Sequence, residues 1–140
     1  MSRRAARALG VTGVVLAFIA PALHAPSTLL RSSVQALSPA PAAVSAAVVM
    51  LVAVTLLVVF ERHRARDAEL RDRTIGAGHL VFILTLWVLT TVVSIVRLAD
   101  DGYADLVVQL AVVIQVVATA SIGVLAAVAL RHDRAADRAS

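Results

Sequence analysis

The sequence contains no cysteine and no lysine, and only 4% of its 140 residues are aromatic. Without cysteine the chain has no disulfides, no thiolate metal ligands and no cysteine nucleophile. Charged residues make up 16% of the chain, below the fraction of about a quarter that is usual in soluble domains. Hydrophobic residues make up 60% and the mean hydropathy is +0.90. These values exclude intrinsic disorder and argue against a water-soluble globule.

Charged side chains are also missing from four long apolar runs. The runs cover residues 8–25, 42–60, 75–96 and 106–130, and none of them contains Asp, Glu, Lys or Arg. A bilayer core of about 30 Å is crossed by about 20 helical residues, so each run is long enough to span it. We therefore predict an all-α membrane protein, a single domain folded as an antiparallel bundle of four transmembrane helices.

The first apolar run also fits a second description. Arg3, Arg4 and Arg7 precede it, and Ala20-Pro21-Ala22 matches the small-x-small pattern of a signal-peptide cleavage site. Pro21 and the nearby Pro26 make this a poor cleavage context. A retained first helix and a cleaved signal peptide both stay open, and the topology of the remaining chain is the same in either case.

The 13 basic residues, all arginine, predict the orientation of the chain. Eleven of them precede the first run, lie between the second and third runs, or follow the fourth, and only Arg31 and Arg97 lie on the other side. The positive-inside rule then places both termini and the middle connection in the cytoplasm of a cell membrane. Acidic residues are interleaved with these arginines and dilute any basic patch, so we predict no nucleic-acid partner and only modest attraction to anionic lipid headgroups.

The middle connection, residues 61–74, is charged on all sides and predicts a solvated helical hairpin tip. Its acidic residues Asp67 and Glu69 each precede an arginine by four positions, a spacing that stabilises helices. We therefore expect the second helix to continue for a few turns into the cytoplasm. A docking surface for a partner is the functional alternative for this segment. Residues 131–140 are predicted to form a cytoplasmic tail.

The two outer connections differ in length. Residues 26–41 either form a short helix in the membrane interface or continue the first helix outward. Residues 98–105 form a loop of eight residues, so we expect the third and fourth helices to be the tightest pair in the bundle. Trp87 falls near the middle of the third run, where we expect it to pack between helices.

Residues suited to catalysis or cofactor binding are scarce. No carboxylate lies in the apolar runs, which disfavours proton- or sodium-coupled carriers. His24 and His79 are predicted at opposite depths and so cannot share a haem. His63, His79 and His132 lack the i,i+3 or i,i+4 spacing that would form half of a metal site. We predict no catalytic, cofactor-binding or metal-binding residues, and hence no enzyme.

The fourth run carries the clearest polar pattern. Small or polar residues recur in it every four positions: Ala111, Gln115, Thr119, Gly123 and Ala127. Gln109 in the same run, and Thr90, Thr91 and Ser94 in the third run, fall at comparable depths. The pattern is typical of helix packing, because small residues let backbones approach and a glutamine can bond to the next helix. A polar path for a small solute is the alternative.

Arg97 is predicted at the outer end of the third helix, where the helix dipole favours a cation. Asp101, Asp100 or Asp105 can pair with it there. An ion pair that anchors the helix end is the simpler interpretation, and a ligand-binding arginine is the alternative.

Residues 67–75 read DAELRDRTI and run directly into an apolar helix. This segment resembles the charged juxtamembrane stretch of small uncharacterised four-helix integral membrane proteins of bacteria and archaea. The resemblance covers the second half of the chain at most, and the Asp-Glu-Arg opening of that family is missing here. It implies a fold and no activity.

These observations lead to two hypotheses for function. The first is a small, non-enzymatic polytopic protein that acts as an accessory, regulatory or assembly partner of a membrane complex. The second is a subunit of an oligomeric transporter or channel for small solutes. The expected partners are the lipid bilayer and either another membrane protein or further copies of the same chain. Exclusive use of arginine, with abundant alanine and valine, suggests a GC-rich prokaryotic genome.

Overall fold

The computed structural model describes residues 2–29, 39–66, 76–101 and 106–139. These residues form four α-helices: α1 (Arg3–Leu29), α2 (Pro39–Ala65), α3 (Ala77–Asp101) and α4 (Leu106–Ala139). Each helix is long and apolar enough to cross a membrane. The prediction of an all-α chain with four such helices is therefore confirmed.

All four helices extend beyond the apolar runs, at one end or at both. The runs that end at residues 25, 60, 96 and 130 continue as helix to Leu29, Ala65, Asp101 and Ala139, and for the second helix such a continuation was expected. The cause is that Ala, Arg and Glu are good helix formers, so a helix continues past the point where its residues become polar. The segment 131–139, predicted only as a tail, is thus a direct extension of α4.

Prolines and one glycine mark the remaining boundaries. α1 starts at Arg3 and continues through Pro21 and Pro26 to Leu29, so the beginning of segment 26–41 extends the first helix, while residues 30–38 lie outside the described part. α2 starts at Pro39, where the missing N–H of a proline leaves no helical bond unmade. Gly76 precedes α3 with a φ of 87°, a conformation that suits glycine.

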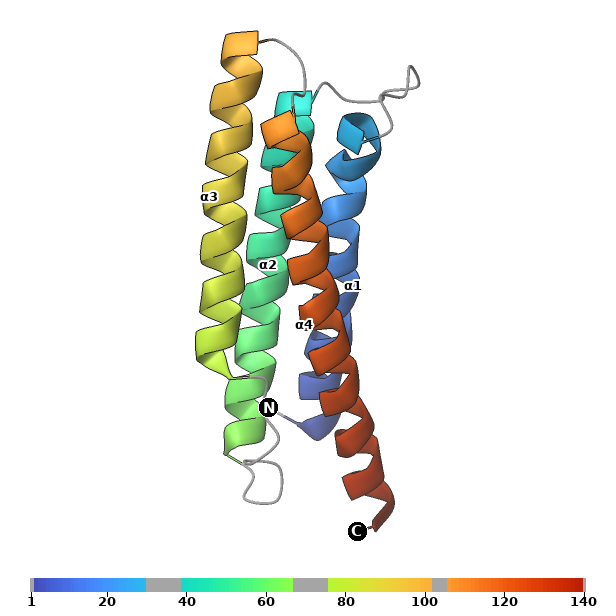
Figure 1. The fold of residues 1–140 in the computed structure, drawn as a ribbon. Coiled ribbons are helices and arrows are strands. Elements are labelled where there is room, and N and C mark those ends of the chain that lie inside the picture. The colour runs from blue at the N-terminus through green and yellow to red at the C-terminus, as the bar shows by residue number, and fades with distance from the viewer. Residues whose placement is uncertain (1, 30–38, 67–75, 102–105, 140) are drawn as a thin grey trace.

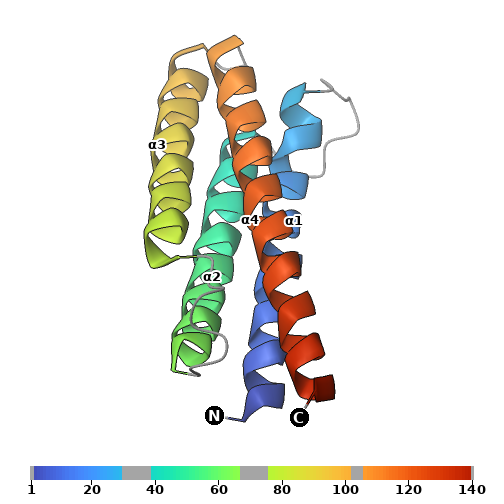
Figure 2. The same ribbon diagram turned by 60° about the horizontal axis from the view of Figure 1, so that its bottom comes forward.

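The four helices lie side by side in an elongated molecule (Figures 1 and 2). α1 packs against α2 and α4, and α3 packs against the same two helices. The beginning of α1 and the ends of α2 and α4 lie at one end of the molecule, where both chain termini are found (Figure 1). We call this the terminal end.

The most extensive helix contact is between α1 and α2, and small residues make it possible. Apart from Pro21, the buried residues of α1 are alanine and glycine at alternating steps of four and three residues: Ala6, Gly10, Gly13, Ala17 and Ala20. Gly10 lies against the ring of Phe60, and Gly13 lies against Leu57 and the carbonyl oxygen of Ala53. The prediction that the third and fourth helices are the tightest pair is wrong, because the short loop between them does not compensate for bulkier facing residues.

The bundle keeps small side chains inside and large aliphatic side chains outside. Its core contains many fully buried alanines around a few larger residues, among them Met50, Leu57, Ile122 and Trp87. Trp87 is therefore packed between helices, as predicted. Valine, leucine and phenylalanine side chains are exposed along all four helices, far beyond the apolar patches that soluble proteins tolerate. This distribution suits a membrane location.

Candidate functional site

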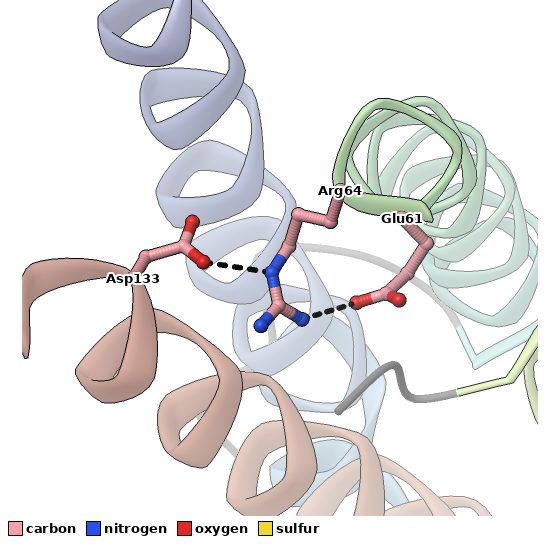
Figure 3. A network of polar contacts seen from close by, with 3 residues as sticks. All are labelled: Glu61, Arg64 and Asp133. Carbon is pink, nitrogen blue, oxygen red and sulfur yellow. Dashed lines mark hydrogen bonds and ion pairs between the residues drawn. The ribbon is translucent and has the colours of Figure 1, made fainter. Parts of the chain in front are cut away.

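Three charged side chains meet inside the bundle near the terminal end (Figure 3). Arg64 of α2 is only 1% exposed. Its Nε donates a hydrogen bond of 2.8 Å to Oδ1 of Asp133 on α4. Its Nη1 donates a bond of 3.3 Å to Oε1 of Glu61, one turn earlier in α2. Glu61 and Asp133 are buried as well.

The local sequence of α2 explains how this ion cluster is held. Glu61 and Arg64 are three residues apart and therefore lie on the same helix face. Phe60, four residues before Arg64, places its ring centroid 5.4 Å from the guanidinium carbon, within the range of a cation–π contact. Phe60 also packs with Ala6 of α1 and Ala129 of α4. The cluster thus rests on an apolar layer that joins three helices.

The ion cluster corrects the prediction that the whole segment 61–74 is a solvated hairpin tip. Glu61 and Arg64 belong to α2 and face the bundle interior, while residues 67–74 lie outside the described part. The spacing of Glu61 and Arg64 was visible in the sequence. Their link to Asp133 was not, because it joins residues 69 positions apart.

The chemistry of the ion cluster is that of a structural ion pair. Both charge-assisted hydrogen bonds link side chains of the protein itself. The bond from Arg64 to Asp133 ties α2 to α4, and the bond from Arg64 to Glu61 lies within α2. Such a bond is stronger than a neutral one. A buried ion pair also specifies one arrangement, because removal of either partner leaves a charge without compensation.

A second polar contact joins α3 and α4 within their apolar stretches. Gln115 is 1% exposed, and its Nε2 donates hydrogen bonds to the hydroxyl oxygens of Thr90, at 2.8 Å, and Thr91, at 3.3 Å. Thr90 in turn donates to the backbone oxygen of Leu86 at 2.7 Å. The structure therefore brings Gln115 and Thr90, two residues singled out in the sequence, into direct contact.

Two other members of the polar pattern form side-chain hydrogen bonds within their own helices. Thr119 and Ser94 are both buried and donate to the backbone oxygens four residues earlier, each at 2.8 Å. Gln109 is half-buried near the start of α4. Gly123 is buried beneath the ring of Phe18 from α1, which would meet an added Cβ at 2.3 Å.

Ala127 departs from the predicted face and is exposed. The cause is the helical period: a step of four residues rotates by about 40° relative to a full turn, so sixteen residues after Ala111 the chain faces nearly the opposite side. Ala126 and Ala129 are buried in its place.

Arg97 lies near the end of α3 with an exposed side chain. Asp101 is the last residue of the same helix, and its side chain lies outside the described part. The ion pair between Arg97 and Asp101 therefore stays a prediction.

We expect the substitution Gln115→Leu to lower the free energy of unfolding by about 1 kcal/mol, because hydrogen bonds between membrane helices contribute roughly that amount. Gln109→Leu is the control on the same helix and is expected to change stability by less than half as much. The measurement is unfolding in detergent micelles by titration with SDS. If Gln115→Leu left stability unchanged but abolished solute flux in liposomes, the polar residues would form a path rather than a packing contact.

An apolar groove of about 280 Å³ runs along the outside of the bundle between α2 and α3. Its lining is aliphatic except for two residues, Trp87 and Thr91, and consists of Val44, Ala47, Val48, Leu51, Leu84, Trp87, Val88, Thr91 and Ile95. Thr91 connects the groove to the polar contact, because its hydroxyl accepts the longer bond from Gln115. Within the described residues, no three His, Asp or Glu side chains gather as a metal site.

Comparison with known proteins gives no further assignment, since no protein family model, curated protein or solved structure matches this chain.

Proposed function

We propose that this chain is an integral protein of a prokaryotic cell membrane that acts, without catalysis of its own, as an accessory or assembly partner of a membrane complex. In this proposal the helices form an antiparallel transmembrane bundle with both termini in the cytoplasm. The pairing of Gly10 with Phe60 and of Gly13 with Leu57 and Ala53 supports opposite directions for α1 and α2. The common position of the chain termini supports an even number of crossings (Figure 1).

The observation that carries the proposal is the use of the buried polar side chains. Arg64 bonds to Glu61 and Asp133, and Gln115 bonds to Thr90 and Thr91. These groups bond to one another inside the bundle, and of those named here only Thr91 also reaches the α2–α3 groove. What the bundle offers to other molecules at membrane depth is therefore its aliphatic surface.

The α2–α3 groove is a part of that surface where another transmembrane helix can pack. Ala47 and Thr91 are small, so a neighbouring backbone can approach closely at these positions, as is usual between membrane helices. The groove also lies on the side of the bundle where α3 makes its contacts with α2, and these contacts are less extensive than those between α1 and α2. We assign this groove to the partner helix.

The proposal predicts that the substitution Ala47→Trp will block the partner. The full chain, tagged and expressed in its own host, is expected to recover a stoichiometric membrane protein in mild detergent, and the indole in the groove is expected to reduce this recovery at least tenfold. Val52→Trp is the matched control, because Val52 is exposed on the same helix outside the groove. Recovery of the chain alone, or equal recovery with both variants, would contradict the proposal.

A further inference from the structure

At the terminal end the described arginines are mostly exposed, whereas the described acidic side chains are buried. The exposed arginines are Arg3 and Arg4 of α1, Arg62 of α2, Arg66 directly after α2, and Arg131, Arg134 and Arg138 of α4. The acidic side chains described at this end, Glu61 and Asp133, are buried against Arg64. These two carboxylates therefore do not dilute the basic surface. The side chains of Asp67, Glu69, Asp72 and Asp137 lie outside the described part, so dilution by them stays a prediction.

The excess of positive charge does not depend on the residues outside the described part. Seven exposed arginines are described at this end, whereas residues 67–74 together with Asp137 contain four acidic residues whose side chains are not described. Even if every acidic side chain faced the same surface, a net positive charge would remain.

The arginines of α4 continue a stripe of aliphatic side chains. Val117, Val124, Arg131 and Arg138 follow one another at intervals of seven residues, which places them on one helix face. All four are exposed, and Arg134 lies on the same side. Asp133 faces the opposite way, into the bundle, where it meets Arg64.

The same arrangement recurs on α2. Val48, Val52, Thr55 and Val59 are exposed at alternating steps of four and three residues, and Arg62 and Arg66 continue the sequence of steps. An exposed and mainly aliphatic face thus leads directly into arginines on two separate helices. The distance along the helix axis from Arg131 to Arg138 is about 10 Å. This length is comparable to the thickness of the headgroup layer plus the length of an arginine side chain.

From this arrangement we propose that the arginine face of α4, residues Arg131, Arg134 and Arg138, binds the phosphate groups of anionic phospholipids whose acyl chains lie against Val117, Val124 and Val128. Guanidinium groups bind phosphate oxygens in a bidentate manner. The aliphatic part of the same face selects a lipid over a free anion, because it supplies contacts for the chains directly below the headgroup. The inference rests on the membrane location proposed above.

The test compares phosphatidylglycerol with phosphatidylcholine. The full chain in a neutral detergent is titrated with each lipid, and native mass spectrometry counts the lipid molecules retained. Each arginine near an anionic surface is expected to contribute about fivefold, so the triple variant Arg131→Gln/Arg134→Gln/Arg138→Gln should lose at least tenfold of the preference for phosphatidylglycerol. The corresponding triple lysine variant keeps the charge but not the bidentate bonds, so it should lose less of the preference than the glutamine variant. Arg97→Gln, at the opposite end of the molecule, should leave the preference unchanged.

Several outcomes would overturn the inference. Equal retention of the two lipids by the wild-type chain, a preference unaffected by salt, or a preference unchanged in the triple glutamine variant would each do so. Displacement of the lipid by 10 mM inorganic phosphate, about a hundredfold excess over the lipid, would show that the site binds a free anion. Binding of polyglutamate more tightly than the lipid would show that the site binds an acidic polypeptide. Extraction of native membranes with alkaline carbonate tests the membrane location separately from the lipid preference. An integral protein stays in the pellet whether or not it prefers one headgroup.

Discussion

The substitution Arg64→Met is expected to lower the free energy of unfolding by about 3–5 kcal/mol, the amount typical for removal of one partner of a buried ion pair. The reason is that Glu61 and Asp133, both buried, would remain as carboxylates without the guanidinium that bonds to them at 3.3 and 2.8 Å. The measurement is SDS-induced unfolding of the purified chain in detergent micelles, followed by circular dichroism.

Two further variants make this expectation specific. Arg62→Met removes an exposed arginine two residues away and should change stability by no more than about 0.5 kcal/mol. The triple variant Glu61→Gln/Arg64→Met/Asp133→Leu removes all three charges and should recover most of the loss, because no uncompensated charge remains. A loss below about 1 kcal/mol for Arg64→Met would show that the ion cluster does not hold α2 to α4.

The substitution Gly13→Leu is expected to be nearly as damaging, with a loss of about 3 kcal/mol at the upper end of the usual range for overpacking. A Cβ at this position already lies 3.0 Å from Cγ of Leu57 and 3.2 Å from the carbonyl oxygen of Ala53. A leucine side chain can fit only if α1 and α2 move apart along their seam. The same SDS titration measures the effect.

The control for this prediction is Thr12→Leu, since Thr12 is the neighbouring residue and is exposed. It should change stability little and can increase it in a lipid environment. Gly123→Ala provides a second comparison: its added Cβ would meet the ring of Phe18, but that ring is half-exposed and free to rotate aside. A smaller loss for Gly123→Ala than for Gly13→Leu is therefore expected, and equal losses would contradict the account of the α1–α2 seam.

The helices could be predicted from the sequence because uninterrupted apolar runs of this length have few other solutions. Their ends were predicted only in part. The continuation of α2 past residue 60 was expected from its charge pairs, but that of α4 through Asp133 was not, because the fourth run stops at its first charge. The contact of Gln115 with Thr90 was within reach, since both lie at similar predicted depths in adjacent helices. The rotation that moves Ala127 out of the interior follows from the helical period, which a step of exactly four residues does not match.

The two features that most determine the packing could not be predicted from the sequence. The steps of four and three from Ala6 to Ala20 are present in the sequence, but alanine and glycine are frequent in every run, so the pattern alone does not say which helix lies opposite. The bond between Arg64 and Asp133 joins positions 69 residues apart, and the sequence offers several other acidic residues as equally plausible partners. Both features depend on how the helices are arranged around one another, which only the structure defines.

The position of Asp133 near the end of the chain has a consequence for synthesis. α1 and α2 can close their seam of small residues as soon as both have left the ribosome, because every residue of that seam lies before position 61. Arg64 is made together with α2, whereas its partner Asp133 on α4 follows only 69 residues later. A chain that is truncated or that fails to insert α4 is left with this arginine lacking its second carboxylate. We therefore expect incomplete chains to be less stable than the full bundle. Quality-control proteases act on proteins of low stability, so such chains should be degraded faster.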